Sequence, residues 1–495
     1  MNRQHFLKTV GWGAVASLTG TALLTGCNNH DMSDIDMMPD MEGMGPAVKE
    51  TPFTTPLRFP ETVTGSAQLT AKSGTEAILP GKNARVLGYR NGILGPTLRV
   101  QSGSEVTFRF SNNLSEDSNI HWHGLLVPAE MDGHPAQVVR AGESFPYTFR
   151  INQAASTAWY HPHPHEKTAR QAYLGLAGMI IVETPTERAL NLPSGSYELP
   201  LIIQDKRLDG TGSPQYTPTM QDVMMGFMGE TITVNGVGGA FHPVATRMYR
   251  MRVVNGSNGR IYNLALSNEA PFWVIGTDGG LLPTPEAVTA LLLSPGERAD
   301  LLVDFSKLPV GTELYLKSNT FPGASAQGKQ AFNILKFRVD KAETDSFQMP
   351  ASLATITTLS TAAVAKSRSF SIGMNMGNMN MGNMKGMHTI NGKVYSMDRI
   401  DETVKLGDTE IWDFDNKGDE PHPMHLHSTF FQVLSRVGGR NTLFANEKGW
   451  KDTVLVMPGE RVRVICRFDK PGLFVAHCHN LEHEDDGMML NFRVS

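Results

Sequence analysis

The chain has 495 residues, with 44 Lys and Arg against 49 Asp and Glu and a formal net charge of -5 at pH 7. This length is typical of about three domains of about 150 residues each, and the near balance of charge gives no indication of nucleic-acid binding. The 29 Pro and 48 Gly favour many short strands and turns over long helices. With three cysteines, the chain has no disulfide framework to hold its fold together.

The first 27 residues are predicted to be an export signal. Arg3 and Lys8 precede an apolar run that is too short to span a membrane convincingly. The run ends in Leu-Thr-Gly-Cys at residues 24–27, which resembles a bacterial lipoprotein cleavage box, so that Cys27 would become the lipidated first residue. We therefore expect a protein of the periplasm or cell envelope whose attachment to the membrane is the lipid on Cys27. A plain secretory signal ending in a chance cysteine is the alternative.

Beyond the signal, residues 28–52 are polar and are predicted to be a flexible tether. From there on, short segments alternate apolar and polar residues, which predicts β-strands. Near the C-terminus, for example, Val462, Val464 and Cys466 alternate with arginines, so Cys466 is expected to be a small buried side chain in a strand. Three blocks of such segments predict an all-β fold of three β-sandwich domains, at 53–190, 191–350 and 351–495.

Histidine pairs with the spacing His-x-His occur in the first and third blocks and not in the middle one. Side chains two residues apart lie on one face of a strand, so each pair can bind one metal site. A random scatter of 16 histidines would not place so many in such pairs. The first block has His121 and His123, then His161, His163 and His165; the third has His422, His425 and His427, then His477 and His479.

The last histidine pair encloses a cysteine. Cys478, together with His483 and Met488, offers the thiolate, imidazole and thioether ligands of a blue-copper site. On a strand, His477 and His479 would face one way and Cys478 the other. A copper ion on Cys478 would then be joined by a short covalent path to whatever the two histidines bind. The alternative is an ordinary cluster of histidines at the surface.

Methionines gather in a stretch whose spacing fits neither a strand nor a helix, with Gly and Asn between them. This pattern is typical of a low-complexity insert, and it also offers a soft thioether surface that would collect Cu(I); the two interpretations are compatible. The stretch holds Met374, Met376, Met379, Met381, Met384 and Met387. A weaker indication of the same kind comes from the tether and from Met220, Met224, Met225 and Met228.

Together, the four motifs His-x-His, His-x-His, His-x-x-His-x-His and His-Cys-His-x-x-x-His-x-x-x-x-Met resemble the copper motifs of the multicopper oxidases, complete and in that family's order. The methionine-rich insert further resembles the bacterial periplasmic cuprous oxidases of the copper-efflux type. The resemblance implies three cupredoxin-like Greek-key β-sandwiches and four copper ions, one in a blue mononuclear site and three in a trinuclear cluster. The middle block would be the family's copper-free domain, and the cluster would lie between the first and third blocks.

The resemblance also implies the ligands. The blue site would be formed by His422, Cys478, His483 and the axial Met488. In the trinuclear cluster, His121 and His425 would bind one copper. His165 lies outside the family's ligand pattern. The coupled copper pair would be bound by His123, His161, His163, His427, His477 and His479.

Two acids match the family's proton-relay groups, namely Asp132, eleven residues after His121, and Glu484, directly after His483. Their alternatives are a turn aspartate and a carboxylate that orients a ligand histidine. In cuprous oxidases a substrate copper site uses Asp and Met shortly before the blue-site histidine. Here Asp419 and Glu420 are available as substrate ligands, but the methionine is missing at that place.

These features predict an enzyme that couples one-electron oxidation of Cu(I) to the four-electron reduction of O2 to water, in copper homeostasis. An axial Met488 implies a blue site of lower potential than an apolar residue would give, which suits Cu(I) better than resistant phenols. A laccase-like phenol oxidase is the alternative within the same chemistry. A copper-buffering or structural envelope protein is the alternative outside it, but a structural relative would have lost several of the twelve ligands, and this chain has all of them.

Overall fold

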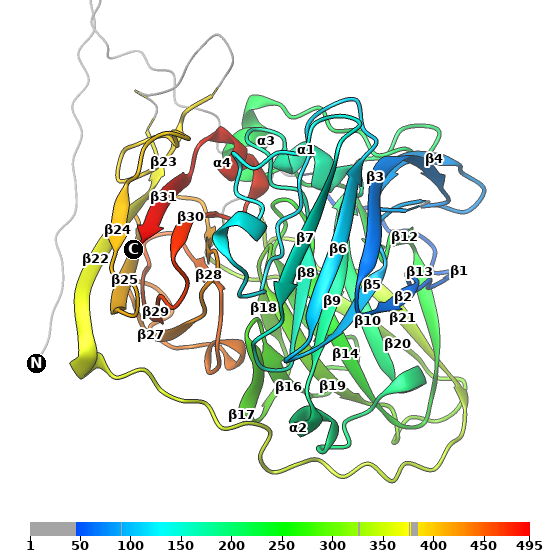
Figure 1. Cartoon of the computed structure of the whole chain (residues 1–495). Coiled ribbons are helices and arrows are strands. Elements are labelled where there is room, and N and C mark those ends of the chain that lie inside the picture. The colour runs from blue at the N-terminus through cyan, green and yellow to red at the C-terminus, as the bar shows by residue number, and fades with distance from the viewer. Residues whose placement is uncertain (1–45, 91, 325–326, 376, 378–384) are drawn as a thin grey trace, which may run out of the picture. The chain divides into compact units, whose positions relative to one another are not determined.

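A computed structural model describes residues 46–90, 92–324, 327–375, 377 and 385–495. The elements of this part are strands β1 to β31 and short helices, so the all-β prediction is confirmed. The strands form six sheets, which pair into three successive sandwiches (Figure 1). The predicted boundaries near 190 and 350 fall between the sheets of successive blocks, because β9 ends at Glu183 and β21 at Lys341.

The first block consists of two four-stranded sheets. In β6 (Glu105–Asn112), Val106, Phe108 and Phe110 are buried and alternate with more exposed residues, as the sequence pattern predicts. One sheet has the order β4 (Ala84–Gly88), β3 (Ala67–Glu76), β6, β7 (Ser144–Arg150). The other has the order β2 (Thr62–Thr64), β5 (Thr97–Gln101), β9 (Gly178–Glu183), β8 (Ser156–Tyr160).

The middle block has the largest sheets. Its six-stranded sheet has the order β1 (Thr55–Pro56), β13 (Ala240–Ala245), β21 (Phe332–Lys341), β20 (Glu313–Ser318), β15 (Tyr262–Leu266), β18 (Leu291–Leu293). Its seven-stranded sheet has the order β12 (Val237–Gly238), β11 (Thr231–Val234), β10 (Glu198–Lys206), β14 (Met248–Asn255), β19 (Arg298–Asp304), β16 (Phe272–Thr277), β17 (Gly280–Val288).

The start of the described chain departs from the prediction. Strand β1, assigned by sequence to the first block, pairs in parallel with β13 of the middle block. The last residues of the predicted tether are also bound there, since Gln330 hydrogen-bonds both the N–H and the C=O of Val48, which is itself buried in the middle core. The rest of the tether and the signal lie outside the described residues.

The third block carries two of the four predicted metal-ligand motifs. Cys466 lies buried in β29, as predicted. One sheet has the order β23 (His388–Ile390), β22 (Val364–Met374), β25 (Thr409–Asn416), β29 (Arg461–Arg467), β27 (Phe431–Val437). The other has the order β24 (Glu402–Val404), β31 (Met489–Val494), β30 (Gly472–Cys478), β26 (His422–Leu426), β28 (Thr453–Val456).

Three short helices, one from each block, meet beside the ligands. They are α1 (Thr168–Tyr173), α3 (Met220–Met225) and α4 (Leu481–Asp486), and α4 contacts both others (Figure 1). The described residues also include α2 (Pro185–Arg188) and the 3₁₀ turns Ala129–Met131, Gly195–Tyr197, Thr361–Ala363 and Ala445–Glu447. A helix long and apolar enough to cross a membrane is not found among the described residues.

Candidate metal centre

The predicted mononuclear site comes together at the end of β30 and the start of α4. The Cys478 Sγ lies 3.6 Å from the Nδ1 atoms of both His422 and His483, and these two nitrogens are 3.1 Å apart. Met488, whose backbone C=O accepts from the N–H of Cys478, is fully buried. Burial lowers the pKa of His422 to about 3 and raises that of the Cys478 thiol above its usual range. A bound cation would provide the charge that a buried thiolate needs.

The middle block covers one edge of this site. The Nε2 atom of His483 lies 3.0 Å from the C=O of Met224 in α3, which makes Nε2 the donor and leaves Nδ1 to face Cys478. Asn480 ties the same helix down by donating to the C=O of Met225, 3.3 Å away. Helix α3 itself begins at a capping box formed by Thr219 and Asp222. The middle block therefore sets which nitrogen of His483 is available to a metal.

Eight histidines converge on the other side of β30. Strand β26 pairs with β30 so that His425 lies opposite His477, whereas Cys478 on the alternate face points to the mononuclear site. In the first block, His121 and His161 face each other across an isolated bridge rather than within a strand, which departs from the predicted strand. The ligand atoms form three groups: His121, His123 and His425; His123, His161 and His479; and His163, His427 and His477.

The distances within these groups fit metal binding. Nitrogen atoms of different residues lie 3.1 to 3.4 Å apart, as in His427 and His477 (3.1 Å) and His121 and His425 (3.4 Å). Two nitrogens at about 2.0 Å from one ion in tetrahedral geometry would be about 3.3 Å apart. The Nε2 of His161 is buried without a hydrogen-bond partner. Burial lowers the pKa of His161 to about 3, so the neutral, metal-binding form of this imidazole is present at neutral pH.

Acceptor oxygens orient these rings. The Nδ1 of His121 donates to the C=O of Asp132 (2.8 Å), and that of His425 to the C=O of Asp452 (2.9 Å). The Nδ1 of His427 donates to the Asp132 carboxylate (2.6 Å). In each case Nε2 is left as the metal-binding atom. His123 is turned the other way, since its Nε2 lies 3.0 Å from Asp452 Oδ1 and its Nδ1 3.2 Å from the Nε2 of His479.

The two predicted acids both contact ligand histidines. Asp132 is buried, burial raises the pKa of its carboxyl well above the usual range, and its Oδ1 has no hydrogen-bond partner. Glu484 is also buried and lies between the blocks. Its Oε1 is 3.3 Å from the Nδ1 of His163 and its Oε2 is 3.2 Å from the Nδ1 of His477. Glu484 thus contacts one ligand from the first block and one from the third.

A buried ion pair that sequence analysis missed lies behind His123. Arg298 of β19 binds Asp452 through two hydrogen bonds, of 2.7 and 2.6 Å, and donates to backbone oxygens of the first and middle blocks as well. Burial alone would raise the pKa of Asp452, but Arg298 and His123 hold it well below its ordinary value. The sequence gives no signal for this pair, because Arg298 and Asp452 lie in different blocks.

The other predicted residues are placed as follows. Asp419 is exposed and Glu420 is buried, three and two residues before His422. His165 lies outside the three groups, and its ring packs edge-on against Tyr395. Met374 is partly exposed and Met387 fully buried. The four methionines between them, Met376, Met379, Met381 and Met384, lie outside the described residues.

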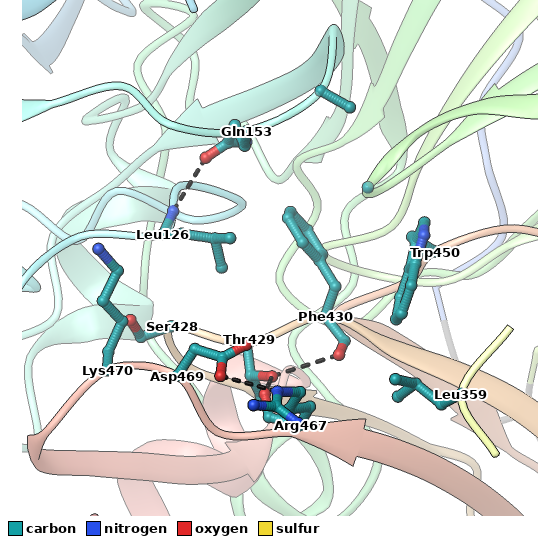
Figure 2. Close-up of a pocket in the computed structure, with 12 residues that line it drawn as sticks. Leu126, Gln153, Leu359, Ser428, Thr429, Phe430, Trp450, Arg467, Asp469 and Lys470 are labelled. Carbon is teal, nitrogen blue, oxygen red and sulfur yellow. Dashed lines mark hydrogen bonds and ion pairs between the residues drawn. The ribbon is translucent and has the colours of Figure 1, made fainter. Parts of the chain in front are cut away.

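A pocket of about 350 Å³ opens where the three blocks meet. Leu126, Phe430 and Trp450 line it (Figure 2), and Ser428, the residue after His427, forms part of its wall. The lining includes none of the four residues of the mononuclear site. An organic molecule bound there would therefore not touch Cys478 or the other residues of the mononuclear site.

A thiol beside two imidazoles, whose peptide neighbours are two of the eight clustered histidines, is the residue set of a protein with two linked transition-metal sites. Residues 70–187 and 371–495 match two family models, both described as multicopper oxidase. The chain belongs to the multicopper oxidase family. It is thus an oxidoreductase that uses copper, with O2 as electron acceptor and a reduced substrate as donor.

The chain is similar to "Multicopper oxidase mco" of Staphylococcus haemolyticus, with 33% identity over 86% of this chain and 88% of the relative. The crystal structure of the McoA multicopper oxidase from Aquifex aeolicus matches with a TM-score of 0.82 and 37% identity, over 89% of this chain and 99% of that one. A multicopper oxidase from Campylobacter jejuni, described as a metallo-oxidase, matches with a TM-score of 0.78 and 30% identity, over 92% and 97%.

The family likeness also reaches a protein with a different description. "Cell division protein FtsP" of Xenorhabdus nematophila is 36% identical over 82% of this chain and 85% of the relative. A likeness of fold and sequence therefore does not decide activity by itself. In this chain the histidines and Cys478 cluster into groups that could bind metal ions, and this clustering favours an oxidase.

Proposed function

We propose that this protein is a cuprous oxidase of the cell envelope, which oxidises Cu(I) with O2. Four copper ions would be held, one by His422, Cys478, His483 and Met488 and three by the eight histidines of the three groups. When bound, these ions would accept single electrons at the first site and deliver four electrons to O2 at the second. Four Cu(I) ions would become four Cu(II) ions while one O2 and four protons become two water molecules.

One observation favours Cu(I) over organic donors. His483, the ligand on α4, has its Nε2 edge against the Met224 carbonyl of α3, and one face of its ring is covered by the ring of His388. All four residues of the mononuclear site are at most 1% exposed. A phenol could not lie against this ligand, whereas a single metal ion needs only a few ligand atoms nearby. The half-buried thioethers of Met220 and Met224 on α3 suit a soft cation.

Residues of this chain would handle the electrons and protons. The peptide bonds that join Cys478 to His477 and His479 give the shortest covalent path between the two sites. Glu484, held between His163 and His477, would pass protons towards the histidine groups. Asp132 would do so beside His121 and His427, since burial raises the pKa of its carboxyl and so makes it a better proton acceptor than an exposed aspartate.

Oxygen uptake tests this function. The purified, copper-loaded protein should consume O2 rapidly with Cu(I) as donor, and it should oxidise 2,6-dimethoxyphenol only when Cu(II) is added as a mediator. Rapid phenol turnover without added copper would instead indicate a laccase. Cys478→Ser should abolish both the blue absorption and O2 uptake. Cys466→Ser, in a buried cysteine of the same sandwich, should abolish neither.

The N-terminal signal supports the envelope location. We expect Cys27→Ser to move the exported protein from the membrane fraction to the soluble fraction of cells. If the Cys27→Ser protein stayed in the membrane fraction, this result would contradict a lipid anchor on Cys27.

A further inference from the structure

His388, which no copper motif includes, lies directly on the mononuclear site. It opens β23, is fully buried, and its ring stacks on that of His483 with centroids 4.0 Å apart and planes inclined by 17°. Because Nδ1 of His483 faces Cys478, a metal held there would be separated from an ion on His388 by two stacked imidazole rings.

The orientation of the His388 ring is fixed by Asp486, the last residue of α4. One Asp486 oxygen accepts from Nδ1 of His388 at 2.7 Å and from its backbone N–H at 2.8 Å. The same carboxylate accepts from the backbone N–H groups of Gly386 (2.8 Å) and Met387 (3.1 Å). The proton of His388 is therefore on Nδ1. A histidine whose Nδ1–H is held by a carboxylate is the usual arrangement of a metal ligand that binds through Nε2.

The Nε2 atom of His388 is buried and has no hydrogen-bond partner in the structure. Buried imidazole nitrogens normally have a partner, and an orphaned one calls for an explanation. If stacking on His483 were the whole role of this residue, a phenylalanine would provide it without the orphaned atom. The lone pair on Nε2 is thus the part of the side chain that packing does not explain.

A thioether is carried by the residue directly opposite His388 in the strand pair. Met374 of β22 is the direct antiparallel partner of His388 in β23. Side chains at directly opposed positions project from the same face of the strand pair, with Cβ atoms about 4.5 to 5.5 Å apart. Met374 is partly exposed, so this pair runs from the surface to the buried ring. Imidazole and thioether together prefer a soft monovalent ion such as Cu(I).

We propose that Nε2 of His388 and the thioether of Met374 form the binding site for the Cu(I) ion that donates the electron. This site rests on the proposed cuprous oxidase function, and it differs from the substrate ligands Asp419 and Glu420 that the sequence indicates. A Cu(I) ion bound there gives one electron through the stacked rings to the copper of the mononuclear site and leaves as Cu(II).

The test uses Ag(I), a redox-inert ion with the same ligand preferences, and the copper-loaded full-length protein. His388→Phe keeps a ring on His483 but removes Nε2. Calorimetric titration should show one fewer bound Ag(I) ion in this variant than in the wild type. The KM for Cu(I) should rise about tenfold or more, the effect expected when a metal site loses a ligand. The blue absorption should be unchanged. His242→Phe, in the middle block, should behave as wild type.

Met374→Leu is the second variant, because it removes a thioether without touching the ring stack. It should weaken Ag(I) binding and raise the KM for Cu(I), whereas Met349→Leu should change neither. Equal Ag(I) stoichiometry and equal KM for Cu(I) in His388→Phe and the wild type would overturn the proposed site. If His388→Phe loses its blue absorption, the test rests on Met374→Leu. Unchanged Ag(I) binding and unchanged KM for Cu(I) in Met374→Leu would then overturn the site. A wild type that binds the extra Ag(I) but does not oxidise Cu(I) would refute the oxidase function and leave the site intact.

Discussion

The middle block holds no metal ligand, yet we predict that it controls copper binding through Arg298. All five N–H groups of this guanidinium are used, in two bonds to Asp452 and three to backbone oxygens of Thr157, Asp278 and Gly296. Asp452 in turn accepts from Nε2 of His123. In Arg298→Met the Asp452 carboxylate would stay buried without its cation, and it would take up a proton or turn away from His123.

Two magnitudes follow from this geometry. Breaking a buried ion pair by removing one partner costs about 3 to 5 kcal/mol of folding free energy. Loss of the oxygen that orients a ligand histidine weakens metal binding about 10- to 100-fold, which is about 1.4 to 2.7 kcal/mol. The second effect should fall on the histidine groups alone, because neither Arg298 nor Asp452 contacts His422, Cys478 or His483 in the interactions described above.

Copper content and electron paramagnetic resonance separate the two effects. Arg298→Met should keep the blue copper signal while it loses copper from the histidine groups. Arg252→Met is the matched control, since Arg252 is an equally buried arginine of the neighbouring strand β14 that binds Glu187 and Glu198. Arg252→Met should lower the free energy of unfolding by about as much as Arg298→Met, but it should keep its full copper content. Loss of copper from both sites in equal measure, or from neither, in Arg298→Met would refute the reasoning.

Three further changes should give distinct results. Glu484→Gln keeps the size of the side chain between His163 and His477 but cannot carry a proton, so O2 reduction should slow about 100-fold with copper content unchanged; unaltered turnover with saturating Cu(I) would contradict a relay role. Burial lowers the pKa of Lys206 to about 7. Between about pH 7 and 10.5 the unfolded chain therefore binds a proton that the folded chain does not, and the free energy of unfolding should rise with pH by up to about 1.4 kcal/mol per unit. Denaturant titrations at pH 7 and 9 should show this rise in the wild type and a smaller one in Lys206→Met. Removal of residues 374–387 should increase direct phenol oxidation, which steady-state kinetics would detect; no increase would mean that this segment does not restrict access.

The clustering of the histidines and of Cys478 could be predicted because their spacing is local. Cys478 lies between His477 and His479, and strand geometry alone sends the thiol and the two imidazoles to opposite faces. The same reasoning predicted the burial of Cys466. Where the local structure is not a strand, as at His121, the two histidines of the pair still fall in one group, and Trp122 between them is buried in the core.

What could not be predicted depends on contacts between distant parts of the chain. Arg298 and His388 carry no motif, and each acquires its importance from a carboxylate more than 90 residues away in sequence. Strand β1 was assigned to the wrong sandwich for the same reason, since a two-residue strand does not reveal which edge it will join. The carbonyl of Met224 at His483 is a backbone atom, and its position follows from the packing of α3 against α4 and not from the identity of the residue.

Almost every residue of helix α4 has a specific contact that restricts which amino acid can stand there. Five consecutive side chains each serve a different neighbour: Glu482 accepts from the backbone of the middle block, His483 faces Cys478, Glu484 lies between two ligand histidines, Asp485 accepts from the start of α1, and Asp486 holds His388. Successive residues of a helix are rotated by about 100°. Deletion of a single residue here would therefore misdirect the electron path, the proton path and the contacts to two other blocks at once. Such a segment evolves by substitution in place and not by changes of length, so its spacing should be far less tolerant of engineering than its composition.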